Sequence, residues 1–139
     1  PAVDVAAARQ ILSMVSLRDR ERFHVLERTI TPSEALNVCG RFRISVAMRL
    51  HYTVFSCMRE VPTLALAYDP KVWAFMNRVG LSDAVIPLER ASRAEIVATA
   101  LRLWERQEQI RELLSERVRL LRAQARINND VLGRLIDSG

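Results

Sequence analysis

Lysine is almost absent from this chain, which carries one lysine against twenty arginines. The net charge of +5 and the pI of about 10.2 would suit a nucleic-acid ligand, but the arginines are scattered and aromatic residues make up only 6%. A nucleic-acid-binding surface usually shows clustered basic residues with aromatic residues among them. The composition therefore argues against nucleic acid as a partner.

Cysteine and long apolar runs are also scarce. Cys39 and Cys57 have no neighbour of metal-ligand type, so we predict two free, buried thiols of a reducing compartment, with a disulfide or metal site as the alternative. No run reaches the eighteen or so apolar residues of a membrane span, and no signal peptide is seen. We expect a cytoplasmic protein, with peripheral attachment at the inner face of the membrane as a variant of that prediction.

The length of 139 residues and an apolar content of 50% are typical of one compact domain. Pro1 stands where an initiator Met would be expected, which suggests a processed chain or a piece of a longer one. Apolar residues at helical spacing predict a helix over 3–15, and Thr31-Pro32-Ser33-Glu34 signals the start of a second helix that Gly40 ends. Between these helices, 24–30 is predicted to be a short strand.

Three short apolar runs predict the strands of a sheet, at 44–48, 63–67 and 84–86, the first of them fully buried. Helical patterns at about 50–60 and 70–78 connect these runs, and each connection has room for one crossover helix and no more. We therefore predict an α/β fold with a small parallel sheet of three or four strands, a partial Rossmann-like arrangement.

The pattern changes at Ser92, where Ser92-Arg93-Ala94-Glu95 forms a capping box. A continuous helix over 92–127 would be roughly 54 Å long, which is too long to lie on one small domain. We therefore expect that it either breaks near Gln107 to Gln109 or projects from the domain and pairs with another segment or chain. Asn128-Asn129-Asp130 predicts a turn before a last helix over 131–136. This pattern divides the chain into an α/β portion, 1–91, and a C-terminal helical segment, 92–139.

Basic side chains follow two neighbouring predicted strands. Arg49 and His51 come after the first strand, and Lys71, the single lysine, comes after the second. Parallel strands end at the same edge of a sheet, where helix N-termini also point, so these groups predict a site for an anion, phosphate plus carboxylate. Taken singly, each is more often a surface residue, and Asp69 is predicted to be an N-cap rather than a catalyst.

Several motifs carry a resemblance to a known family. Met48-Arg49-Leu50-His51, Val61-Pro62 and Tyr68-Asp69-Pro70-Lys71, together with Val54-Phe55, Phe75 and Gly80-Leu81, resemble in order the C-terminal half of the polysaccharide pyruvyl transferase family. The resemblance implies two facing Rossmann-like domains, similar to glycosyltransferases of the GT-B type, of which this chain supplies part of the second. The N-terminal domain of the parent protein would then be absent from this sequence.

The resemblance also implies an activity, transfer of pyruvate from phosphoenolpyruvate to two sugar hydroxyls of a cell-surface or lipid-linked polysaccharide, forming a cyclic ketal. It assigns Arg49 and His51 as catalytic residues, with Arg49, Lys71 and Tyr68 binding phosphoenolpyruvate and His51 as general acid. It implies no metal and no organic cofactor. The partners would be phosphoenolpyruvate, the acceptor and the N-terminal domain, and the chain alone would have little or no activity.

The sequence departs from the family pattern at two positions. Tyr52 replaces the small residue that usually follows the histidine, and Glu60 replaces a glycine before Val61-Pro62. The alternative to an enzyme is a non-enzymatic interaction module, in which 92–127 forms a homodimer or docks a partner. The sequence leaves the acceptor sugar and the oligomeric state open.

Overall fold

The computed structural model describes residues 2–137 of the chain, with side chains over 4–127. The chain divides into two compact units, Pro1–Pro32 and Ser33–Gly139. The expected division of the chain into an α/β portion, 1–91, and a C-terminal helical segment, 92–139, stays a prediction.

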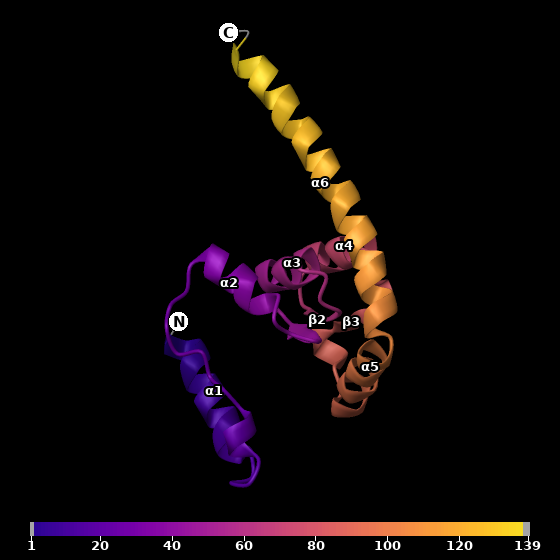
Figure 1. Cartoon of the computed structure of the whole chain (residues 1–139). Helices are drawn as coiled ribbons and strands as arrows, with labels where there is room; N and C mark the ends of the chain where they lie inside the picture. The colour runs from indigo at the N-terminus through magenta and orange to yellow at the C-terminus, as the bar shows by residue number, and fades with distance from the viewer. Residues whose placement is uncertain (1, 138–139) are drawn as a thin grey trace. The chain divides into compact units, whose positions relative to one another are not determined.

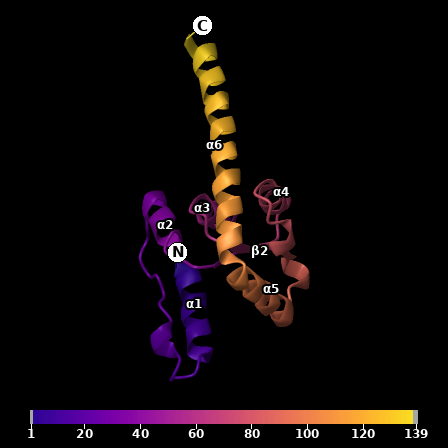
Figure 2. The same cartoon turned by 45° about the vertical axis from the view of Figure 1, so that its right-hand side comes forward.

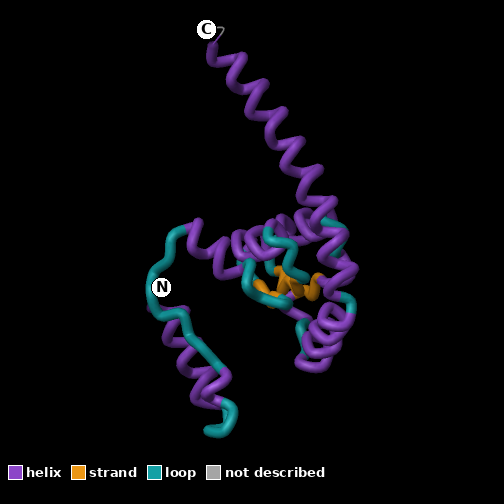
Figure 3. The backbone as a smooth tube through the Cα atoms, viewed as in Figure 1, coloured by secondary structure: helices purple, strands orange, loops and turns teal. Residues whose placement is uncertain are grey.

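The first unit contains α1 (Ala2–Met14) and a short 3-10 helix, η1 (Arg20–Arg22), followed by an extended loop (Figure 3). The helix predicted over 3–15 is confirmed. The strand predicted over 24–30 is wrong, because the described part of this unit offers no second strand and an isolated strand leaves its backbone groups unpaired. The loop is instead tied to α1 by a two-bond pair in which Arg9 donates to both carboxylate oxygens of Glu27, at 3.0 and 2.6 Å.

The second unit is built on a parallel sheet of three strands in the order β1-β2-β3. The strands are β1 (Ser45–Ala47), β2 (Thr63–Ala67) and β3 (Val85–Pro87). Ser45 pairs with Thr63 and Leu66 with Ile86, which fixes the register of β2 between its two neighbours. The predicted α/β fold with a small parallel sheet is confirmed.

Helices cover both faces of this sheet. The crossover helices α3 (Leu50–Met58) and α4 (Pro70–Arg78) lie on one face, and α5 (Arg93–Glu105) lies on the other (Figures 1 and 2). Right-handed crossovers between neighbouring parallel strands place both helices on the same side. The remaining short elements are α2 (Pro32–Cys39), η2 (Ser82–Ala84) and η3 (Leu88–Arg90).

The core lies around β2, in which every residue except Leu66 is buried. Apolar side chains from both helical layers meet there, and the largest fully buried ones include Leu64, Val72, Met76, Ile86 and Leu114. Leu114 belongs to the C-terminal segment, so this segment completes the core that the sheet begins.

β1 is less buried than its sequence suggests. The prediction of a fully buried strand over 44–48 is wrong in that Val46 and Met48 are 52% and 45% exposed. The reason is position: β1 pairs only with β2 in the described sheet, and α5 packs chiefly against β2. An apolar run reveals how well a segment suits burial but not whether it occupies the centre or the edge of a sheet.

The C-terminal segment forms two helices, α5 and α6 (Gln107–Asp137), separated at Arg106. The helix therefore breaks, beside the predicted place, and Ser92 caps α5 by accepting from the backbone N–H of Glu95 at 3.2 Å. The turn predicted at 128–130 is wrong, because α6 continues to Asp137 (Figure 1). Asn and Asp cost a helix only about half a kcal/mol each relative to alanine, too little to end one.

Both cysteines are free and buried, as predicted. No helix in the part of the chain that the structure describes is long and apolar enough to cross a membrane.

Candidate active site

The turn between β1 and α3 contains two of the predicted site residues. Arg49 has an extended backbone and is the N-cap of α3, and His51 lies in the first helical turn; both side chains are exposed. The carbonyl oxygen of Arg49 accepts hydrogen bonds from the backbone N–H and from Oγ1 of the buried Thr53, both at 3.1 Å. These bonds fix the backbone from which the arginine and histidine side chains project.

A buried pair of serines holds α3 against β1. Ser56 Oγ donates to Ser45 Oγ at 3.0 Å, which joins the last turn of the helix to the first residue of the strand. Ser56 is fully buried, so its hydroxyl would be costly to leave without a partner. The pair thus specifies how the helix lies on the strand and keeps the turn in place.

The turn between β2 and α4 contains the other two predicted residues. Asp69 is the predicted N-cap: its Oδ1 accepts from the backbone N–H of Lys71 at 2.8 Å, and Pro70 occupies the first turn. Lys71 is exposed, and Tyr68 is 60% exposed immediately before the cap. The aspartate is thereby assigned to helix capping.

The sheet brings these two turns to one edge. Ala47 pairs with Ala65 in the parallel ladder, so both strands run into their helices at the carboxyl edge of the sheet. Open α/β sheets bind ligands at this edge. The structure therefore confirms the predicted neighbourhood of the turns, and the chemical roles of the four side chains stay predictions.

The two helix N-termini differ in their electrostatics. The first turn of α3 contains no acidic residue, and Arg49 makes no side-chain cap bond. At α4, by contrast, the Asp69 carboxylate already neutralises part of the helix dipole. The positive end of the helix dipole at this edge is therefore less neutralised at α3 than at α4.

A cavity of about 210 Å³ opens beside the β1 turn. Its lining comes from the end of α2, from β1 and from α3: Cys39, Phe42, Ser45, Val46, Ala47, Met48, Arg49, Tyr52 and Ser56. Of the predicted site residues, Arg49 lines this cavity, whereas His51, Tyr68 and Lys71 do not.

Tyr52 shares the cavity with Arg49 and is 44% exposed, with its ring packed edge-on against Phe55 at 6.2 Å between centroids. This residue is absent from the predicted site. The sequence did contain a signal for Tyr52, because a bulky residue stands where the resembled family has a small one. The contribution of α2 had no such signal, because only the fold brings Cys39 beside β1.

The fold and this edge define a class, an α/β protein with cationic side chains and a bare helix N-terminus at the carboxyl edge of a parallel sheet. Comparison with known families specifies it further: the sequence model of the polysaccharide pyruvyl transferase family matches residues 2–70. Over this segment the chain belongs to the polysaccharide pyruvyl transferase family. The match includes Arg49, His51 and Tyr68 and ends one residue before Lys71. No curated protein and no solved structure matches the chain.

Proposed function

We propose that this chain forms one wall of a pyruvyl transferase active site that uses phosphoenolpyruvate as donor and two sugar hydroxyls of a polysaccharide as acceptor. The observation that carries the proposal is the family match over both turns of the carboxyl edge, up to Pro70. The anion chemistry agrees, because phosphoenolpyruvate presents a phosphate and a carboxylate to a helix N-terminus flanked by cations.

In the proposed reaction, Arg49 binds the phosphate or the carboxylate with its planar guanidinium. His51 donates a proton to the methylene carbon, which becomes a methyl group, and the adjacent carbon becomes electrophilic. One sugar hydroxyl oxygen bonds to that carbon, and the second displaces inorganic phosphate. Of the two hydroxyl protons, one restores the imidazolium and the other leaves on the phosphate, so the reaction yields the ketal and hydrogen phosphate.

Imidazole suits this role because it can both donate and accept a proton. Tyr68 and Lys71 are the accessory ligands of the donor, placed at the neighbouring turn. All four side chains are exposed on the described chain, and catalytic groups in open solvent are poorly preorganised. A facing Rossmann-like domain of the GT-B type would exclude this water, so we expect residues 1–139 alone to transfer little or no pyruvate.

The test uses the full-length parent protein and measures ketal formation from phosphoenolpyruvate. Arg49→Ala should raise KM for phosphoenolpyruvate, and His51→Ala should lower kcat by about 10²–10⁴-fold and remove the ionisation of a catalytic acid from the pH profile. Matched controls are Arg41→Ala, an exposed arginine before β1, and His24→Ala, an exposed histidine in the other unit. Transfer retained in both site variants would overturn the assignment.

The alternative function is an interaction module that dimerises through 92–127, and the burial of α6 limits which of its faces could form the dimer. Leu114 and Val118 are 0% and 6% exposed in the single chain because they pack into its own core. A homodimer would therefore have to use other faces of α6. The mass of the protein in solution, measured by light scattering across a concentration series, separates a monomer from such a dimer.

A further inference from the structure

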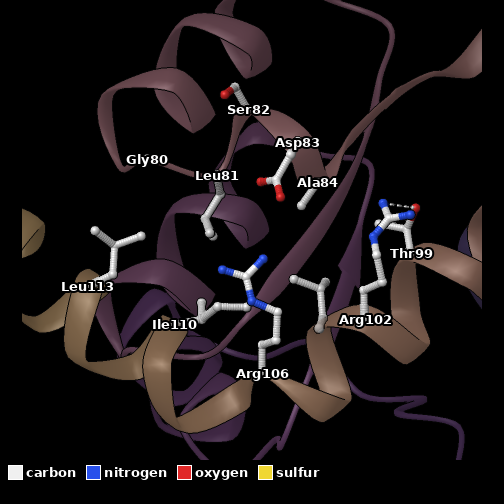
Figure 4. Close-up of a pocket in the computed structure, with 11 residues that line it drawn as sticks. Gly80, Leu81, Ser82, Asp83, Ala84, Thr99, Arg102, Arg106, Ile110 and Leu113 are labelled. Atoms are coloured by element: carbon white, nitrogen blue, oxygen red, sulfur yellow. Dashed lines mark hydrogen bonds between the residues drawn. The ribbon is translucent and has the colours of Figure 1, made fainter.

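A second cavity, of about 290 Å³, lies beside η2 (Figure 4). Because η2 precedes β3, this is the amino edge of the sheet, whereas the candidate active site lies at the carboxyl edge. The cavity is placed between η2, which leads into the first residue of β3, and the junction of α5 with α6 at Arg106. Its lining is Gly80, Leu81, Ser82, Asp83, Ala84, Thr99, Arg102, Leu103, Arg106, Ile110 and Leu113. None of these residues belongs to the matched family segment or to the proposed transferase site.

The floor of this cavity is apolar and belongs to the core of the second unit. Leu81, Leu103 and Ile110 are 2%, 4% and 6% exposed and belong to the core cluster. Such a floor can contact the carbon skeleton of a small ligand. The volume of the cavity, about 290 Å³, is close to the lower end of the range for small-molecule sites.

The rim of the cavity carries charges of both signs. Arg106 projects into the space between Ile110 and Asp83, and the Asp83 carboxylate points toward it from η2 (Figure 4). The guanidinium of Arg106 makes one long hydrogen bond, from Nε to Gln109 at 3.4 Å, and Arg102 donates to the Oγ1 of Thr99 at 2.9 Å. No ion pair joins Asp83 to either arginine among the described side chains.

A purely structural role explains this arrangement only in part. Arginines in the last turn of a helix compensate its dipole, which accounts for Arg102 and Arg106 as charges on α5. It does not account for the Asp83 carboxylate, which faces Arg106 across the cavity without forming a salt bridge (Figure 4). The two terminal nitrogens of Arg106 and the Asp83 oxygens thus present hydrogen-bond donors and acceptors to the same cavity.

We propose that this cavity binds a small phosphate monoester that carries hydroxyl groups, a phosphorylated sugar or polyol. The phosphate, with a charge of about −1.5 to −2, is held by the two guanidinium groups, which prefer phosphate in a forked geometry. The ligand hydroxyls donate to the Asp83 carboxylate, and the carbon skeleton packs on Leu81 and Ile110. Phosphoenolpyruvate has no hydroxyl group, so this ligand is distinct from the proposed donor.

Such a ligand would join η2 to the α5–α6 junction. Arg106 is the single residue between the two helices, and its side chain would become fixed by the phosphate. Binding to the folded state alone raises the apparent stability, so the melting temperature should rise with ligand concentration. The site therefore provides a means of holding α6 in one direction without contact with the transferase edge.

The test measures binding to the 139-residue chain by calorimetry, with glycerol 3-phosphate, inorganic phosphate and glycerol as probes. Glycerol 3-phosphate should bind more tightly than inorganic phosphate, and glycerol should not bind. Arg106→Gln and Arg102→Gln should each weaken both phosphates by about tenfold or more. Asp83→Ala should leave inorganic phosphate at least as tight, because a like charge is removed, and should abolish the advantage of glycerol 3-phosphate.

The matched control is Arg93→Gln, which removes the same charge from an exposed position at the start of α5, outside the cavity. Affinity should be unchanged in this variant. An equal loss in Arg93→Gln, binding within twofold of wild type in both cavity variants, or no binding of glycerol 3-phosphate at about 10 mM would each overturn the proposal. These outcomes are independent of the transferase assay, which concerns other residues.

Discussion

Buried hydroxyl and thiol groups on α3 and β2 lie near the candidate active site. Thr53, Ser56 and Thr63 are fully buried, as is the thiol of Cys57. Thr63 Oγ1 donates to the carbonyl of Val61 at 2.8 Å, so this layer is satisfied locally. It fixes the position of α3 on the sheet, and the exposed Arg49 depends on that position.

Cys57 gives this layer a measurable pH dependence. Burial raises the pKa of the Cys57 thiol from 9.0 to about 12, only partly opposed by a hydrogen bond with Thr63. In the unfolded chain the thiol ionises near its ordinary value, so above about pH 9 the unfolded state binds fewer protons than the folded state. Stability is therefore lost as pH rises from about 9 towards 12, by up to about 1.4 kcal/mol per pH unit.

The measurement is urea unfolding between pH 8 and pH 10.5 for the wild type and Cys57→Ala. The wild type should lose more stability than the variant over this interval, although the variant starts lower because of its small cavity. Parallel pH dependence in the two proteins would contradict the assignment of a buried, protonated thiol.

Both crossover helices end in a left-handed residue, but they use different residues for it. Gly80 follows α4 with φ of 82°, whereas Glu60 follows α3 with φ of 61°. The backbone N–H groups of Glu60 and Val61 donate to the carbonyls of Cys57 and Ser56 at 2.9 and 3.0 Å, which closes the end of α3. A side chain in this conformation is strained, and the position is one where the resembled family has glycine.

Substitutions at these two helix ends should change the free energy of unfolding in opposite directions. Glu60→Gly should stabilise the chain by about 0.5–1 kcal/mol, because relief of strain exceeds the added entropy of an unfolded glycine. Gly80→Ala should destabilise it by about 1–2 kcal/mol, since its Cβ would also lie 3.3 Å from Cδ2 of Leu113. Urea midpoints for both variants test this, and a destabilised Glu60→Gly would show that the Glu60 side chain is needed.

Local signals explain why the element order could be predicted and some details could not. Asp69-Pro70, Ser92 with Glu95 and Gly80 are short-range cap signals, and each marks the helix end it predicts. The false strand over 24–30 and the exposed face of β1 depend on whether a partner segment exists, which local pattern does not contain. The cavity beside Arg49 could not be predicted for the same reason, since α2 reaches it only through the fold.

At the scale of the whole molecule, the family segment depends on the residues that follow it. Trp104 of α5 lies 5.8 Å from the guanidinium carbon of Arg43, and Arg122 of α6 donates to the carbonyl of Met58 at 3.4 Å. Both contacts reach from the C-terminal helices back into residues before Pro70. An apolar contribution adds to these contacts, because α6 buries Ile110, Leu114 and Val118 within the second unit.

A substitution at Leu114 tests this dependence, because Leu114 is fully buried and lies far beyond the matched segment. Truncation to alanine removes core packing and leaves a cavity, so Leu114→Ala should cost about 2–5 kcal/mol. Leu120→Ala, in the same helix at 42% exposure, should change stability by no more than about 0.5 kcal/mol. If α6 were a projecting helix that served only to pair with a second chain, the two variants would differ little in a monomer. Urea unfolding of both variants at low protein concentration therefore distinguishes a helix that completes the core from one that serves only to bind a second chain. An unchanged m value would show that the variants differ in stability alone.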